Sequence, residues 1–114
     1  MEAPAAGSVR VANEVVASIA AMAATEVDGV VCLDVARARH LGDWIKRYTA
    51  HRGVRVLVDS DRGIHLDVFL VVDSTAVVPE VGERVQANVI EAVERMLGLE
   101  VAEANVLVSS VSFP

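Results

Sequence analysis

Apolar positions recur at a helical spacing in two long stretches of the chain. The first stretch, which Gly29 follows, contains Val16, Ile19, Ala20, Ala23 and Val27. The second stretch lies between Pro79 and Gly98 and contains Val81, Val85, Val89, Ala92 and Met96. This spacing places apolar side chains on one helical face, while proline is typical of helix starts and glycine of helix ends. We therefore expect two helices here, each with one buried face.

The start of the first helix is predicted from two polar residues. Asn13 can accept a hydrogen bond from an amide of the first turn, and Glu14 places an acid where the helix dipole favours one. The preceding segment Val9–Val11 is expected to form a short edge strand. Residues 1–8 are rich in alanine, and we expect them to form a flexible tail before a single domain over residues 9–114.

Shorter apolar or alternating runs predict the strands of a sheet. Val30–Val35 is an apolar run that we expect to be a buried strand. Val54–Val58 and Ile64–Val72 flank a turn with a glycine at position 63, which predicts a hairpin. In the longer of these strands every second residue, starting from Ile64, is apolar, so one face should be buried. Ala104–Val111 also alternates and predicts a last strand.

Together these elements predict an α+β fold with two layers. Two main helices should pack on one face of a small mixed β-sheet that contains a central antiparallel hairpin. The segment Ala36–Arg52 has two interpretations. Leu41, Trp44, Ile45 and Tyr48 fall at helical spacing, which favours a short amphipathic helix. A long mobile loop is the alternative, because Gly42 weakens the helical pattern.

Composition points to an aliphatic core in a reducing compartment. The chain is 54% hydrophobic, yet only 4% of it is aromatic, so Val, Ile, Leu and Ala must fill the core. The single cysteine, Cys32, permits no internal disulfide, and we expect it to be a small buried hydrophobe in a cytoplasmic protein. No apolar run approaches the roughly 18 residues of a membrane span. We therefore expect no direct membrane insertion and attachment to a membrane only through a partner.

Charge is distributed unevenly along the chain. The net charge is −6, which disfavours nucleic acid and anionic membrane, but six of the ten cations lie between Arg37 and Arg55. The candidate partner- or anion-binding residues are Arg37, Arg39, Trp44, Lys46, Arg47 and Arg52. Two structural alternatives remain open. The segment is a solvated helix face whose aromatic residues pack on the sheet, or it meets the acidic surface of a second copy.

No motif in the sequence specifies catalysis, a cofactor or a metal. Glu26 and Asp28 in "TEVDG" could suggest an acid pair, but residues two apart on a helix point about 200° from one another. We interpret them as solvated acids at a helix end that Gly29 stops. The glycines form no phosphate-binding motif, the His and Cys residues lack metal-ligand spacing, and no G-x-S-x-G elbow is present.

Four segments carry a resemblance to a known family. They are "VRVANEVVASIAAMAATEVDGV" (Val9–Val30), "GVRVLVD" (Gly53–Asp59), "DVFLVVD" (Asp67–Asp73) and "VPEVGERVQANVIEAVERMLGLEVAEANVLVSSV" (Val78–Val111). In their residues and in their order along the chain, these segments resemble the alkaline shock protein family of bacteria, also called the envelope stress response family. The resemblance implies a small cytoplasmic α/β protein, linked to envelope stress and often held at the membrane by other proteins. It supplies no catalytic residues, and Ala36–Arg52 departs from the common pattern by being unusually basic.

We therefore expect a non-enzymatic, homo-oligomeric stress-response protein. It should support cell-envelope homeostasis through self-association and through binding to membrane-anchored partner proteins. The alternative is a nucleic-acid-binding module that uses Arg37–Arg55. An enzyme of unknown type ranks last, because no chemical motif supports it.

Overall fold

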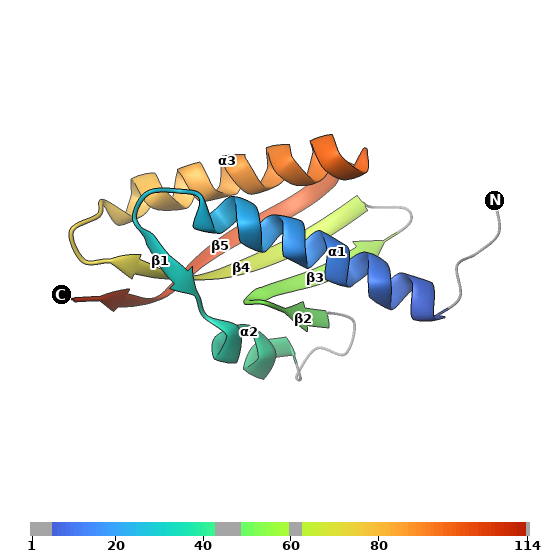
Figure 1. The fold of residues 1–114 in the computed structure, drawn as a ribbon, viewed down its shortest axis with the longest axis horizontal. Helices are drawn as coiled ribbons and strands as arrows, with labels where there is room; N and C mark the ends of the chain where they lie inside the picture. The colour runs from blue at the N-terminus through green and yellow to red at the C-terminus, as the bar shows by residue number, and fades with distance from the viewer. Residues whose placement is uncertain (1–5, 43–48, 60–62, 114) are drawn as a thin grey trace.

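The computed structural model describes residues 6–42, 49–59 and 63–113. Its elements in chain order are α1 (Ala6–Thr25), β1 (Val30–Leu33), α2 (Val35–Gly42), β2 (Thr49–His51), β3 (Val54–Asp59), β4 (Gly63–Asp73), α3 (Val78–Leu97) and β5 (Val101–Ser112). Figure 1 shows α1 and α3 side by side across one face of the sheet, with α2 beside β2. The predicted α+β class is therefore confirmed.

Strand β4 organises the mixed sheet, because it pairs with three other strands. On one side it pairs antiparallel with β3 along its first half and with β1 along its second half. On the other side β5 runs parallel to it for nearly its full length. The change of partner falls at Phe69, whose N–H donates to the Gly53 carbonyl at 3.1 Å and whose carbonyl accepts from the Asp34 N–H at 2.8 Å. The predicted central hairpin, formed by β3 and β4, is also confirmed.

The core lies between the helices and one face of the sheet. The sheet contributes the alternate β4 residues Ile64, Leu66, Val68, Leu70 and Val72, each at most 1% exposed. Helix α3 contributes Val81, Val85 and Val89, and α1 contributes small residues such as Ala17, Ala20 and Ala24. Small side chains allow α1 to lie close to the strands. The period-2 and helical patterns therefore predicted the two layers correctly.

The start of α1 differs from the prediction. The helix begins at Ala6, so the expected edge strand at Val9–Val11 is wrong, and residues 6–8 of the expected tail are helical. Residues 1–5 lie outside the described residues. Asn13 is inside the helix at 6% exposure, so its predicted role as a cap is also wrong. The helical spacing of apolar residues in fact continues from Val9 to Val16, and no proline interrupts it.

Strand β1 is shorter and more exposed than its apolar sequence predicts. It ends at Leu33, Val31 is 51% exposed, and Cys32 is exposed, so the expectation of a buried cysteine is wrong. The physical reason is the position of β1 in the sheet. Among the described strands, β1 pairs with β4 alone and so lies at an edge, and the β1–β4 register shifts between Val30 and Cys32. Similarly, Met96 leaves the predicted core stripe of α3 at 52% exposure, while Val93 is fully buried.

The basic segment contains two short elements. Helix α2 covers part of the predicted amphipathic helix but ends at Gly42, the residue that weakens the pattern. Strand β2, which was not predicted, follows at Thr49–His51 and pairs antiparallel with β3. Trp44, Ile45 and Tyr48 lie outside the described residues, so the predicted packing of these side chains stays a prediction.

Candidate functional site

The cations that the sequence singles out are distributed over separate elements. Arg37 and Arg39 are exposed on α2, and Arg52 is exposed in the turn before β3. Trp44, Lys46 and Arg47 lie outside the described residues. Arg55, which closes the basic run, is only 7% exposed on β3 and pairs with Asp67 at 3.4 Å. Within the described residues the run therefore presents exposed charge at three positions, while its last cation is part of the sheet.

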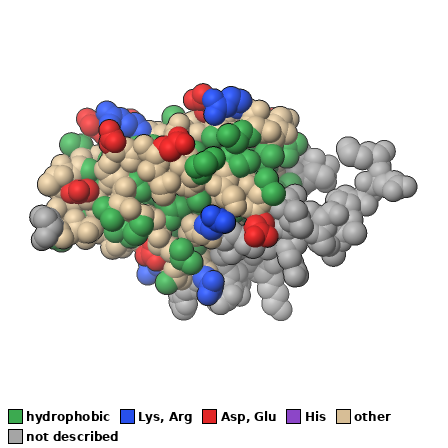
Figure 2. Space-filling view, viewed as in Figure 1, with side chains coloured by type: hydrophobic (Ala, Val, Ile, Leu, Met, Phe, Trp, Pro, Cys, Tyr) green, Lys and Arg blue, Asp and Glu red, His purple; other side chains and the backbone are tan. Residues whose placement is uncertain are grey.

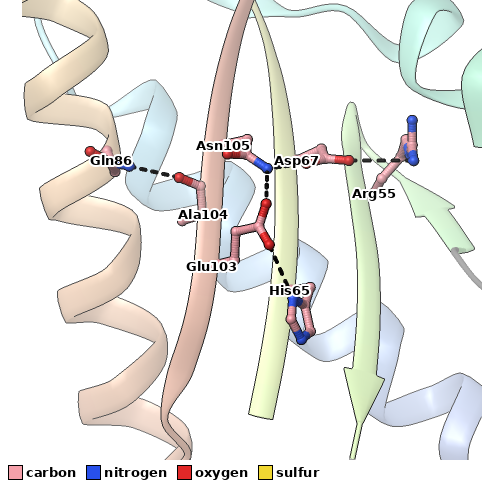
Figure 3. Close-up of polar contacts among 7 residues, drawn as sticks. All are labelled: Arg55, His65, Asp67, Gln86, Glu103, Ala104 and Asn105. Atoms are coloured by element: carbon pink, nitrogen blue, oxygen red, sulfur yellow. Dashed lines mark hydrogen bonds and ion pairs between the residues drawn. The ribbon is translucent and has the colours of Figure 1, made fainter. Parts of the chain in front are cut away.

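A ladder of polar side chains crosses the face of the sheet opposite to α1 and α3 (Figure 3). Asn105 on β5 donates from Nδ2 to Asp67 Oδ1 at 3.1 Å and to Glu103 Oε1 at 2.6 Å. Asp67 also pairs with Arg55, and His65 Nδ1 lies 3.5 Å from Glu103 Oε2. This polar ladder therefore joins β3, β4 and β5.

Apart from the Asn105–Glu103 hydrogen bond within β5, each link of the polar ladder joins residues that stand opposite each other on neighbouring strands. Arg55 faces Asp67, Asp67 faces Asn105, and His65 faces Glu103 in the sheet register. Cross-strand pairs of this kind stabilise one register over others. The hydrogen bond from Asn105, followed by the one from His65, holds the pKa of Glu103 below its ordinary value of 4.5. The contacts of the polar ladder therefore stabilise the observed register of β3, β4 and β5.

A second polar contact joins the turn after β1 to the middle of the sheet. The Ser109 hydroxyl lies 2.7 Å from Asp34 Oδ2 and 3.1 Å from the Leu70 carbonyl, at an irregularity in the β4–β5 pairing. Asp34 Oδ1 accepts from the Arg37 N–H at 2.9 Å, in the first turn of α2. That hydrogen bond, followed by the one from Ser109, holds the pKa of Asp34 below 3.8. Asp34 therefore anchors α2 to the sheet, a role that its sequence position did not reveal.

The segment "TEVDG" is the end of a helix, as predicted. Helix α1 ends at Thr25, whose hydroxyl lies 3.0 Å from the Ala21 carbonyl, and both Glu26 and Asp28 are exposed. Gly29 has a φ of +100°, which L side chains rarely adopt. These two acids are therefore surface residues at a helix–strand junction.

A groove lies along the side of β5 that faces away from β4, next to the first half of α3. Its volume is about 600 Å³. Helix α3 contributes Pro79, Gly82, Glu83 and Gln86, β5 contributes Asn105, Val106 and Leu107, and the groove extends over the sheet to Arg55, Asp67 and Phe69. Gly82 leaves a gap in the helix surface, because a Cβ built there would meet nothing within 4 Å. We call this surface the α3–β5 groove. Sequence alone offered one signal for it, a glycine in the interior of a helix.

An apolar surface lies between α1 and β1. We call it the α1–β1 groove; it is lined by Ile19, Met22, Val31, Cys32, Leu33 and Val35, among others. Met22, Val31 and Val35 are all exposed. Figure 2 shows that hydrophobic side chains occupy several places on this helix-bearing face, separated by isolated charged groups. Exposed apolar groups that gather in one place are typical of interaction surfaces.

The structure is that of a small α+β protein. Its surface carries the two grooves described above, and its polar ladder stabilises the pairing of the strands. Within the described ranges no helix is long and apolar enough to cross a membrane. Residues 1–113 match the model of the alkaline shock protein 23 family, which is described as having a cell envelope-related function. The chain therefore belongs to this family, and the resemblance found in the sequence is confirmed.

Two relatives from Bacillus subtilis (strain 168) are similar to this chain over most of its length. The uncharacterized protein YqhY is 33% identical over 107 residues, covering 94% of this chain and 78% of YqhY. The uncharacterized protein YloU is 29% identical over 109 residues, covering 92% of this chain and 88% of YloU. No solved structure matches the chain significantly.

Proposed function

We propose that this chain is a non-enzymatic protein that supports cell-envelope homeostasis in bacteria. It acts through self-association and through binding to membrane-anchored partner proteins. The observation that carries this proposal is membership of a family with a cell envelope-related function over residues 1–113. The protein is cytoplasmic and reaches the membrane through its partners.

Two surfaces support a binding role. Apolar side chains of the α1–β1 groove are exposed, and removing them from water on association would be favourable. The α3–β5 groove combines a strand edge with an open gap at Gly82. The described polar clusters, by contrast, are explained by contacts between strands and at the start of α2. The proposal therefore assigns function to surfaces rather than to a reacting group.

A genetic experiment tests the envelope role. Cells that lack this protein should lose viability under alkaline or cell-wall stress, and a plasmid copy should restore it. A variant with Met22→Lys and Val31→Lys should restore viability poorly, whereas Met96→Lys, which adds the same charge at another exposed methionine, should restore it fully. Equal survival of cells with and without the protein under every envelope stress would overturn the proposal.

A further inference from the structure

We propose that the α3–β5 groove binds an extended, Lys- or Arg-bearing peptide segment of a partner protein. The segment adds to the free edge of β5 as a further strand. This inference rests on the proposed function, because it names the chemistry by which a partner is recognised. Three observations carry it: the direction of the edge groups of β5, the gap in α3, and the charge around the groove.

The backbone of β5 directs hydrogen-bonding groups away from β4. The Ala104 carbonyl accepts from Gln86 Nε2 of α3 at 2.7 Å, so this carbonyl points to the free side. Alternate residues of a strand direct their N–H and C=O groups to the same side, so Val106 and Val108 do so too. Within the described residues, β4 is the strand that pairs with β5. An edge of this kind is a template for another extended chain.

Side chains of α3 cover the first half of this edge. Glu94 Oε2 accepts a hydrogen bond from the Val101 N–H at 3.0 Å, and the Gln86 side chain donates one to the Ala104 carbonyl. The groove starts at the second of these contacts, where Gln86 lines it, and continues along Asn105, Val106 and Leu107. The covered half therefore sets one end of the binding site, and an added strand would pair with the second half of β5.

Gly82 provides the room that an added strand needs. It lies in the interior of α3, where glycine is less favourable than alanine by about 1 kcal/mol. Its missing side chain is not required by packing within the described chain, since a Cβ there meets nothing within 4 Å. Glycine at this position instead lets a peptide backbone lie between α3 and β5.

Charge around the groove selects a basic occupant. Glu83 lines the groove, and Glu80 is exposed nearby on α3. Glu100, just before β5, and Glu103, which already contacts Asn105 and His65, are exposed at the other end of the strand. The cation that lines the groove, Arg55, already pairs with Asp67. A second copy of β5 would bring its own acids to this surface, which like-charge repulsion disfavours. A Lys/Arg-bearing segment is attracted instead, and cytoplasmic flanks of membrane-spanning helices are rich in these residues.

A synthetic peptide tests the proposal on the full chain. The probe is a labelled nine-residue peptide of alternating valine and lysine, titrated at low salt with fluorescence anisotropy as the readout. Binding should be at least about tenfold weaker when glutamate replaces the lysines, and it should be lost when proline replaces alternate residues, because proline lacks the N–H donor. Amide NMR shifts on adding the peptide should map to the second half of β5 and the first half of α3.

Matched variants locate the site on the protein. Glu83→Lys should weaken binding at least about tenfold, while Glu91→Lys, the same reversal on another exposed part of α3, should leave it within about twofold. Gly82→Leu should also weaken binding by filling the gap, and Glu91→Leu should not. Circular dichroism confirms that each variant is folded, and Glu83→Lys carries the test if Gly82→Leu is not.

Three outcomes would overturn the inference. They are an absence of binding, equal effects of Glu83→Lys and Glu91→Lys, or dilution-dependent NMR shifts on β5 without peptide, which would place a second copy in the groove. Failure here leaves the proposed function standing if deletion cells still lose viability under envelope stress. The proposed function fails separately if that phenotype is absent.

Discussion

Gly29 constrains the junction between α1 and β1 through a single missing side chain. Its φ is +100°, and a Cβ built there would lie 2.8 Å from Val81 Cγ2 and 3.0 Å from Ala76 Cβ. Its carbonyl also accepts from the Asp73 N–H at 2.9 Å, so the junction is tied to the end of β4. A glycine that was predicted only to stop a helix is therefore also a packing residue between α1 and α3.

Gly29→Ala should lower the free energy of unfolding by about 2 kcal/mol or more, because backbone strain and overlap with Val81 add together. Gly98→Ala is the matched control. Gly98 also has a positive φ, +66°, but no atom lies within 4 Å of its built Cβ, so only about 1 kcal/mol should be lost. Urea unfolding with an unchanged m-value measures both. Equal losses in the two variants would contradict the close contact at Gly29.

Acid should destabilise the protein partly through Glu103 and Asp73. Hydrogen bonds from Asn105 and His65 lower the pKa of Glu103, and those from the Thr75 N–H and hydroxyl lower the pKa of Asp73. A pKa that is lower in the folded state gives stability that is present above the unfolded value and is lost as pH falls through the folded value. The contribution is therefore intact at neutral pH and is lost progressively as pH falls below about 4.

Glu103→Gln and Asp73→Asn should each make the fall in unfolding free energy between about pH 5 and pH 3 shallower than in the wild type. Urea unfolding at a series of pH values measures that slope. A slope that is unchanged in both variants would show that these hydrogen bonds do not favour the charged carboxyls.

Cys32 should react with a thiol reagent in the folded protein. It is exposed on β1, so the native thiol should be modified completely without denaturant, at a rate close to that of the unfolded chain. Absorbance of the released thiolate follows the reaction. Protection of Cys32 until urea unfolds the chain would support the buried position that the sequence predicted and contradict the exposed one.

At the scale of elements, the open space at Gly82 leads us to expect that a larger residue there would stabilise α3. Gly82→Ala should raise the free energy of unfolding by about 1 kcal/mol, because alanine favours the helix and its Cβ has open space. Thermal and urea unfolding measure the gain. A loss of stability would mean that the position is packed against a neighbour, and would remove the argument that the gap serves a bound strand.

Long periodic elements could be predicted from the sequence more completely than short ones. Helix α3, with Pro79 near its start and Gly98 as its cap, and the hairpin of β3 and β4 follow directly from spacing and turn residues. Strand β2 and helix α2 are short, so their existence depends on contacts with the rest of the fold. Val9–Val11 was misassigned because three alternating residues cannot distinguish a strand from a helix.

At the scale of the whole molecule, the polar ladder could be predicted only in part. Alternation placed His65 and Asp67 on the face away from the core, but their partners Asn105 and Glu103 follow nearly forty residues later in the chain. These contacts depend on the register of the parallel strands β4 and β5, and that register is set by the complete sheet. The α3–β5 groove likewise needs the helix and the strand edge together, so its residues carried no joint signal in the sequence.

Self-association should depend on the α1–β1 groove. The wild-type protein should sediment well above the mass of its 12.1 kDa chain at high concentration. Met22→Lys combined with Val31→Lys should shift it to the monomer, because charges replace apolar groups that association would bury. Met96→Lys controls for added charge and should sediment as the wild type does. A monomer at every wild-type concentration would contradict this prediction.

We propose above all that this protein acts by binding other proteins. The most direct measurement is cross-linking in intact cells, with a photoreactive amino acid placed at Glu83 or, as the control, at Glu91. We predict that a membrane-anchored protein cross-links at position 83 during envelope stress, and that the purified pair binds directly. Cross-links at neither position above the level of an unrelated acidic protein, with or without stress, would contradict the claim.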